Sequence, residues 1–187
     1  FGHPMYCRTI RLALAYAAAA LTLTACAQNS GAEKPAFDVT AYQGPTFELP
    51  LANTGEKVKF TDYLGQDGPV LVNFWGTWCG PCRRETPEFV EVYSEYKSKG
   101  VEFVGVAIRD TPQRVNSFVD EYHVEWPQVI GVIQTAMDWG PVHAAPTTII
   151  FDSQGAELQR HTGPMTGQML RTALDAALKH EQTLTAS

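Results

Sequence analysis

The sequence predicts an α/β fold in which a central mixed sheet is flanked by helices. Two segments, 70–75 and 101–108, are apolar on both faces, which is typical of buried central strands. Each is followed by a segment with helical periodicity, and the chain closes with a strand at 147–151, a turn, a strand at 158–162 and a helix. Strands that alternate with helices and end in a hairpin favour an α/β sandwich.

The first predicted element is a β-hairpin that precedes the central strands. Apolar and polar side chains alternate over 47–51, and a turn-forming sequence follows at 53–56. The apolar residues Val58 and Phe60 then resume the alternation. We therefore expect an N-terminal hairpin extension of the main sheet.

Three helices are predicted around the sheet. The first follows the cysteine pair at Cys79 and ends at Gly100, the second begins at Thr111 and Pro112, and Thr166 caps the third. Each has an apolar face at helical spacing, which is expected to pack on the sheet. These faces are Phe89, Val92, Tyr93 and Tyr96 in the first helix, Val115, Phe118, Val119 and Tyr122 in the second, and Leu170, Ala173, Leu174, Ala177 and Leu178 in the third.

Composition excludes several classes of protein. The chain has 187 residues, 44% hydrophobic and 18% charged, which suits one globular domain with a self-sufficient core and argues against disorder. The net charge of -6 disfavours a nucleic-acid partner, because phosphate binding needs a basic surface. Four cysteines are too few for a disulfide-stapled miniprotein.

The N-terminal residues have the pattern of an export signal. Arg8 and Arg11 precede an uncharged stretch rich in Ala and Leu, which is too short for a transmembrane helix. The stretch ends in Leu-Thr-Ala-Cys, which resembles a bacterial lipobox. That resemblance implies cleavage after a signal peptide at 1–25, lipid on Cys26 and a flexible tether at 26–36, with the domain at 37–187. A plain signal peptide or an uncleaved anchor is the alternative.

This interpretation leaves two cysteines in the folded part of the chain. Cys7 leaves with the signal and Cys26 carries lipid, so Cys79 and Cys82 remain. Removal of Arg8 and Arg11 takes two positive charges from the net charge of -6, which makes the mature charge -8. The more acidic mature protein argues further against a polyanionic partner.

The segment Trp78-Cys79-Gly80-Pro81-Cys82 lies between a buried strand and the start of a helix. Free backbone N–H groups at a helix N-terminus stabilise negative charge, so Cys79 is expected to be the exposed cysteine, with a lowered pKa. Cys82, one turn further on, is positioned to attack a mixed disulfide formed at Cys79. A structural disulfide and half of a zinc site are the alternatives, but no second cysteine pair or paired histidines supply further zinc ligands.

The segment Val-Asn-Phe-Trp-Gly-Thr-Trp-Cys-Gly-Pro-Cys at 72–82 resembles the active site of thioredoxin-fold proteins. Its continuation, Arg-Arg-Glu-Thr-Pro at 83–87, is similar to the TlpA/ResA-like extracytoplasmic group. This resemblance covers about Thr46 to Leu178. It implies a thioredoxin fold, in which the N-terminal hairpin and a central helical insertion at 112–122 fit the group.

The resemblance also implies further site residues. Pro146, in Ala-Pro-Thr before a strand, is expected to be cis and to pack beside the disulfide, with the Ala145 backbone binding substrate. Trp78, Gly80 and Pro81 are expected to contact substrate as well.

The family places a proton-handling acid at Glu85, one turn after Cys82, and the alternative is a solvated helix carboxylate. Thioredoxins instead use a buried Asp at a position that is Asn73 here. This difference favours Glu85 as the acid.

Several aromatic and histidine residues remain ambiguous. Trp75 is expected either to line the site or to pack in the core. Trp139 and His143 precede Pro146, in a loop that is about one residue longer than the family pattern. This difference puts the substrate-contact loop in doubt. For His143 the two interpretations are an influence on Cys79 and an exposed loop residue, and the second is favoured.

The resemblance implies a membrane-tethered, extracytoplasmic thiol-disulfide oxidoreductase, periplasmic if the cell is Gram-negative. The Gly-Pro spacer resembles that of reducing thioredoxins, which predicts a reductant. The implied clients are exported cysteine-containing proteins, for example in cytochrome c maturation, and the implied electron donor is a membrane protein of the DsbD/CcdA type. No cofactor beyond the Cys79–Cys82 disulfide, no metal and a monomeric state are expected.

Two other functions fit the same fold. A non-catalytic binding module or copper chaperone would bind metal tightly and exchange disulfides poorly. A thiol peroxidase would require the pattern Pro-x-x-x-Thr-x-x-Cys, but Val72 and Gly76 occupy the Pro and Thr positions before Cys79.

Overall fold

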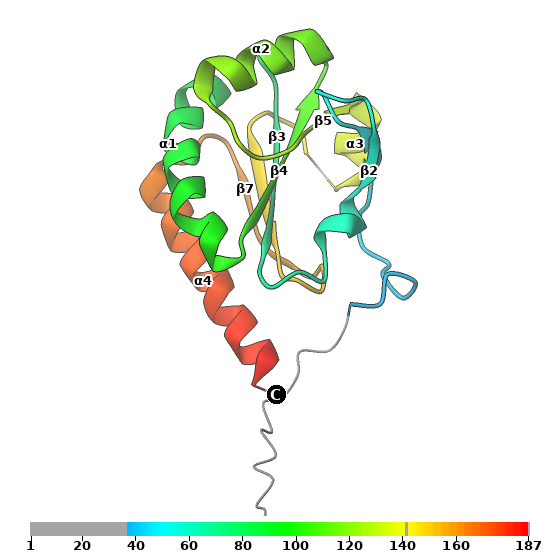
Figure 1. Ribbon diagram of the computed structural model, residues 1–187, viewed down its shortest axis with the longest axis vertical. Helices are drawn as coiled ribbons and strands as arrows, with labels where there is room; N and C mark the ends of the chain where they lie inside the picture. The colour runs from blue at the N-terminus through cyan, green and yellow to red at the C-terminus, as the bar shows by residue number, and fades with distance from the viewer. Residues whose placement is uncertain (1–36, 141, 187) are drawn as a thin grey trace, which may run out of the picture. The chain divides into compact units, whose positions relative to one another are not determined.

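The computed structural model describes residues 37–140 and 142–186, and their centre is a five-stranded sheet (Figure 1). The strand order is β5-β4-β3-β6-β7, with β3, β4 and β5 parallel and β6 and β7 antiparallel to their neighbours. This mixed sheet confirms the predicted fold class. The strands are β3 (Val70–Trp75), β4 (Glu102–Ile108), β5 (Gln128–Gly131), β6 (Thr147–Phe151) and β7 (Glu157–Thr162).

The central strand β3 is buried along its whole length, as its apolar sequence predicts. Because side chains alternate along a strand, Leu71 and Trp75 enter one hydrophobic cluster, whereas Val70, Val72 and Phe74 enter another on the opposite face. The sheet thus separates two cores, and each core needs its own covering layer.

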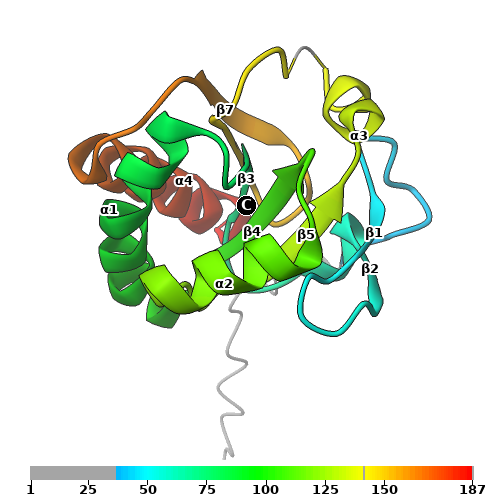
Figure 2. The same cartoon turned by 90° about the horizontal axis from the view of Figure 1, so that it is seen from above.

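Helices cover the first face. Figures 1 and 2 show α1 beside α4, with α2 near the N-terminal end of α1. The predicted apolar faces supply this core, including Phe89, Val115 and Leu170. The helices are α1 (Gly80–Tyr96), α2 (Pro112–Tyr122) and α4 (Gly167–Thr185), with a short 3₁₀ helix η2 (Lys97–Lys99) after α1.

The helix boundaries follow their capping residues. The Thr111 and Thr166 side chains accept hydrogen bonds from Arg114 N–H and Met169 N–H at the starts of α2 and α4. Gly100 follows η2 with φ 84°, a left-handed conformation that glycine adopts without a steric penalty.

The second face is covered by the N-terminal hairpin, a 3₁₀ helix and a short α-helix (Figure 2). Trp139 lies at the centre of this layer, 1% exposed, and its ring centroid lies 4.8 Å from that of Phe60 and 5.5 Å from that of Phe74. These elements are β1 (Glu48–Pro50), β2 (Lys57–Lys59), η1 (Phe60–Tyr63) and α3 (Ile133–Asp138).

Three local features differ from the sequence prediction. Phe60 begins η1 instead of continuing the hairpin strand, because its ring turns into the second core. Neither β5 nor α3 was predicted. Each is short, and α3 leaves Ile133 and Met137 exposed, so its sequence lacks the usual amphipathic pattern.

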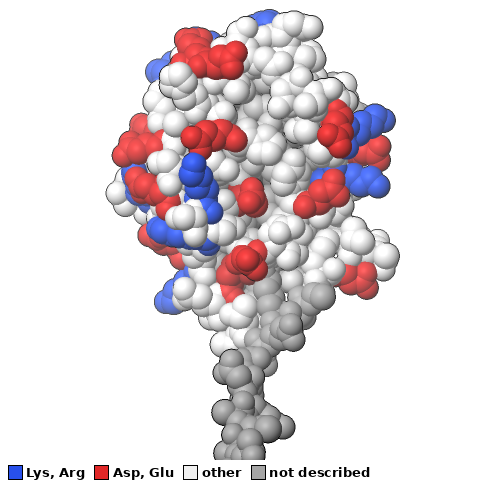
Figure 3. All heavy atoms as spheres, in the orientation of Figure 1, with Lys and Arg blue, Asp and Glu red and all other residues white. Residues whose placement is uncertain are grey.

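Charged side chains of both signs share the surface in view in Figure 3. On the side formed by α1 and α4, Arg171 bridges Glu91 and Glu95, and Lys97 pairs with Glu125. Such exposed pairs contribute little to stability individually, about 0.2–1 kcal/mol.

The predicted signal peptide at 1–25, Cys26 and the tether at 26–36 lie outside the described residues. Within 37–140 and 142–186, no helix has both the length and the apolarity that a membrane crossing requires.

Candidate active site

The site begins where β3 ends and the chain turns toward α1. Gly76 permits this turn, because a Cβ atom there would lie 2.5 Å from Nε1 of Trp78. The N–H of Cys79 donates to the Gly76 carbonyl at 3.0 Å, and Cys79 then caps α1. Pro81 occupies the first helical turn, where a missing N–H has no cost.

Cys79 and Cys82 form a disulfide. The N–H of Cys82 donates to Sγ of Cys79 at 3.2 Å, so one free backbone donor in the first turn of α1 points at this sulfur. A thiolate at this position would be stabilised by the same N–H and by the helix dipole.

The prediction that Cys79 is exposed was wrong for this disulfide form. Cys79 is 4% exposed and Cys82 is 1% exposed. The Ala145 carbonyl lies against the Cys79 sulfur, and Ala145 and the neighbouring Trp78 both line the adjacent groove.

The loop before β6 supplies one wall of the site. The Ala145–Pro146 peptide bond is cis, which confirms that prediction, and the Ala145 carbonyl oxygen lies 3.4 Å from Sγ of Cys79. Because β6 runs antiparallel to β3, the start of β6 lies at the end of β3 that carries the cysteines. The Ala145 backbone is therefore next to the sulfur that a substrate would approach.

A groove of about 350 Å³ continues from this wall. Trp78 forms one side of the groove and is 49% exposed, although its Nε1–H donates to the Ile108 carbonyl at 2.9 Å. His143 is exposed and lines the groove with Arg109, whereas Trp139 is buried in the second core and does not line it. The apolar lining residues are Phe74, Trp78, Ile108, Ile133, Ala136, Val142, Ala144 and Ala145.

Glu85 lies one turn after Cys82 and is buried, 4% exposed, so the alternative of a solvated helix carboxylate is wrong. Burial raises the pKa of Glu85 from 4.5 to about 7. Hydrogen bonds from the Met165 N–H, at 2.9 Å, and from the Asn73 amide oppose this shift, and the charge of Glu88 adds to it. A carboxylate of this pKa exchanges protons near neutral pH.

Trp75 belongs to the core side of the site. Its Nε1–H donates to Oε1 of Gln128 at 2.8 Å, and its ring centroid lies 4.6 Å from that of Phe118. Gln128 in turn fills the space over Gly105, where a Cβ atom would lie 1.9 Å from Oε1 of Gln128.

Three residues around the site were missed by the sequence analysis: Asp110, Gln128 and Met165. Each meets its partner through a contact that spans 33 to 80 residues. No local spacing in the sequence signals such contacts.

The chemistry of the site is that of sulfur. Within the described part of the chain, no group of three or more His, Cys, Asp or Glu side chains could hold a metal ion. A cysteine pair at a helix N-terminus, with a buried acid one turn away, is suited to thiol-disulfide exchange.

Comparison with known proteins agrees with this chemistry. The model of the AhpC/TSA family matches residues 40–156. The thiol-disulfide oxidoreductase ResA of Halalkalibacterium halodurans is 36% identical over 121 residues, which are 65% of this chain and 68% of that protein. ResA of Bacillus subtilis is 35% identical over 126 residues, 67% of this chain and 69% of that protein.

Solved structures share the fold. A putative thiol:disulfide interchange protein DsbE from Chlorobium tepidum is 31% identical, with a TM-score of 0.65 over 72% of this chain and 94% of that one. StoA from Bacillus subtilis, at 24% identity, has a TM-score of 0.56 over 68% of this chain and 95% of that one, and shows the fold alone. The chain therefore belongs to the AhpC/TSA family of the thioredoxin superfamily and is a ResA-like thiol-disulfide oxidoreductase.

Proposed function

We propose that the chain is a membrane-tethered, extracytoplasmic reductant of disulfides in exported proteins, including those of cytochrome c maturation. The observation that carries this proposal is the cysteine pair at the start of α1 with buried Glu85 one turn beyond it. The Gly-Pro spacer supports the reducing direction, because it is the spacer of the reducing thioredoxins that the segment resembles. The lipobox-like sequence ending at Cys26 supports the tether and the location.

In the first step, the Cys79 thiolate attacks one sulfur of a client disulfide. A bond forms between Cys79 Sγ and that sulfur, the client S–S bond breaks, and the other client sulfur leaves as a thiolate that takes up a proton. The Cys82 N–H and the N-terminus of α1 stabilise the attacking thiolate. The client segment lies along Ala145 and the apolar groove, so an extended apolar segment around the client cysteine fits best.

In the second step, Cys82 attacks Sγ of Cys79 and releases the second client thiolate. The Cys82 thiol must first lose its proton, and Glu85 is the acceptor one turn away. Its pKa of about 7 is suited to taking that proton and returning it to the client thiolate. Overall, two electrons pass from the two cysteine sulfurs to the client, and the Cys79–Cys82 disulfide remains.

The oxidised pair then needs an electron donor on the same side of the membrane. We propose a membrane thiol protein of the DsbD/CcdA type, which attacks the disulfide in the reverse sense and restores two thiols. No nucleic acid takes part, and a monomer is sufficient, because both cysteines come from one chain.

The test combines a functional assay with trapping. Purified protein should catalyse insulin reduction by dithiothreitol, and its potential should lie near the thioredoxin value of roughly -270 mV. In cells, a Cys82→Ser variant should accumulate mixed disulfides with exported proteins, whereas a Cys79→Ser variant should not. A potential near the roughly -120 mV of strong oxidants, without insulin reduction, would refute the reducing role.

A further inference from the structure

A second buried carboxylate lies beside the active-site loop. Asp110 follows β4 and precedes α2, and its side chain has no exposed surface. Burying an ionised carboxylate is costly without compensating hydrogen bonds. The hydrogen-bond partners of Asp110 therefore show which segments it connects.

The partners of Asp110 lie on two different elements. One carboxylate oxygen accepts from the Thr77 N–H at 2.6 Å, and the other accepts from the Thr77 hydroxyl and from the Thr111 N–H, both at 3.0 Å. Nε of Arg114 lies 3.5 Å from the second oxygen. Asp110 therefore joins the loop two residues before Cys79 to the first turn of α2.

A neighbouring contact fixes the same stretch of loop. The Nε1–H of Trp78 donates to the Ile108 carbonyl at 2.9 Å. Arg109, between the two anchoring residues, has φ 54°, which is uncommon for a residue other than glycine. The segment 108–110 thus holds both residues that lead into Cys79.

We propose that Asp110 is a positioning residue for the thiol-disulfide reaction. By fixing Thr77, it sets where Sγ of Cys79 lies relative to the Cys82 N–H and the Ala145 carbonyl. Preorganisation of this kind raises the effective concentration of one cysteine toward the other, and small displacements of reacting groups lower rates strongly.

Asparagine cannot replace this carboxylate. The two oxygens of Asp110 accept from two backbone N–H groups, those of Thr77 and Thr111. An amide has one oxygen and one NH₂ group, so in either orientation one backbone donor would face another donor. Asp110→Asn must therefore release either the active-site loop or the start of α2.

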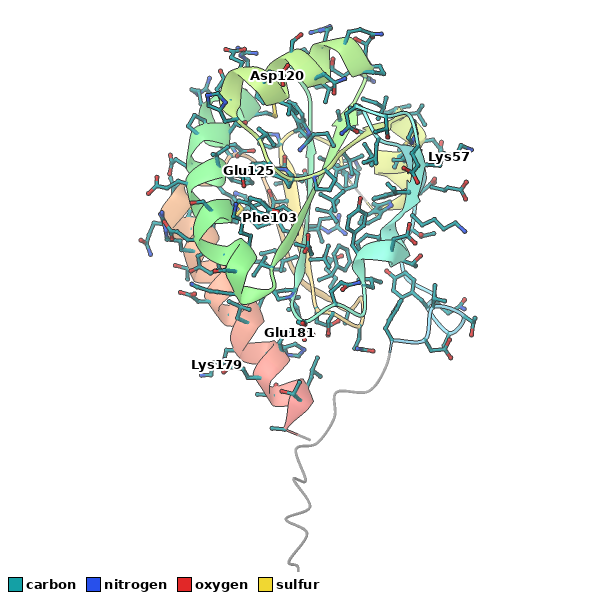
Figure 4. The ribbon with its side chains drawn as sticks, viewed as in Figure 1. Lys57, Phe103, Asp120, Glu125, Lys179 and Glu181 are labelled. Carbon is teal, nitrogen blue, oxygen red and sulfur yellow. A yellow bond between two sulfur atoms is a disulfide. The ribbon has the colours of Figure 1, made fainter. Side chains whose placement is uncertain are left out.

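The test compares three variants of the full chain. Asp110→Asn removes the charge and one acceptor, Thr77→Val removes the hydroxyl bond but keeps the charge, and Asp120→Asn removes a charge from an exposed site on α2 (Figure 4). For each, the equilibrium of the Cys79–Cys82 disulfide with glutathione is measured, with urea unfolding of the oxidised and reduced forms and the pH profile of Cys79 alkylation.

We expect the equilibrium constant for forming the Cys79–Cys82 disulfide to fall about tenfold in Asp110→Asn, which corresponds to about 30 mV. A fall of about threefold is expected in Thr77→Val and none in Asp120→Asn. Thr77→Val separates positioning from charge, because it leaves the Asp110 carboxylate in place.

Two results would overturn the proposal. If Asp110→Asn and Thr77→Val lower the stability of both redox forms equally and leave the glutathione equilibrium unchanged, the contact is purely structural. If Asp110→Asn alone shifts the equilibrium, with a matching fall in the Cys79 alkylation pKa, then Asp110 acts by its charge. Should Asp110→Asn fail to fold, Thr77→Val decides between these outcomes.

Discussion

Two buried glutamates, at opposite ends of the helical layer, have different surroundings. Glu85, 4% exposed, lies beside the cysteine pair at the start of α1, whereas Glu181, 5% exposed, lies near the end of α4 (Figure 4). Both carboxylate oxygens of Glu181 accept from Ser153, one from its N–H and one from its hydroxyl at 2.8 Å. These bonds fasten α4 to the turn between β6 and β7.

Glu85 also accepts hydrogen bonds, from the Met165 N–H and the Asn73 amide. Its neighbours include the negative charge of Glu88, and burial outweighs its hydrogen bonds, so its pKa rises to about 7. Burial alone therefore does not identify a functional acid. Glu85 lies one turn from a reacting thiol, where a pKa near neutrality suits proton transfer.

The largest expected effect is on the pH dependence of the free energy of unfolding. The folded pKa of Glu85, about 7, lies above its unfolded value near 4.5, so between these values the folded state binds more protons. The contribution of Glu85 to stability is thus fully present below about pH 4.5 and is lost as pH rises through 7, by roughly 3 kcal/mol.

Urea unfolding of the oxidised protein from pH 4 to 8 measures this loss without interference from cysteine titration. Glu85→Gln should remove this component, and Glu181→Gln should keep it. An identical pH dependence in wild type and Glu85→Gln would show that Glu85 titrates normally.

The next effect concerns activity. Glu85→Gln removes the proposed proton acceptor, so insulin reduction at pH 7 should slow about 100-fold, or about 2.7 kcal/mol in activation free energy. The release of a trapped mixed disulfide by Cys82 should slow by the same factor, while the initial attack by Cys79 changes little. Equal slowing of both steps would contradict the assignment.

The matched variant at the other glutamate should have the opposite profile. Glu181→Gln leaves one of the two Ser153 donors without a good acceptor, which should lower the free energy of unfolding by about 1–3 kcal/mol. Insulin reduction should be unchanged. A loss of activity in a stably folded Glu181→Gln protein would break the contrast between the two glutamates.

The smallest effect is expected at His180, next to Glu181. Its Nε2 lies 3.3 Å from the Asp152 carboxylate, but its side chain is 41% exposed. His180→Ala should therefore lower the free energy of unfolding by about 0.5 kcal/mol. A loss above about 2 kcal/mol would mean that this end of α4 is held mainly by the pair.

Much of the fold was predictable because its signals are local. Apolar runs define β3, β4 and β6, and Thr111, Thr166 and Gly100 mark helix ends. β5 was missed because its first residue, Gln128, is polar and becomes buried through its bond with Trp75, 53 residues away.

In the site, too, the features that follow from a local motif were predictable and those that depend on distant contacts were not. The cysteine pair and the cis bond before Pro146 follow from a motif, whereas the burial of Glu85 depends on Met165, 80 residues away. The exposure of Cys79 was predicted wrongly, because its sulfur lies against the Ala145 carbonyl, which comes from a loop 66 residues away.

The small exposed area of Cys79 limits which thiols can react with it. Because Cys79 is only 4% exposed, a small thiol that collides with the protein at random seldom reaches its sulfur. A protein that binds in the groove and places its own cysteine beside Cys79 is not limited in this way. The shape of the groove therefore helps to select the proteins that exchange electrons with the cysteine pair, in addition to the redox potential.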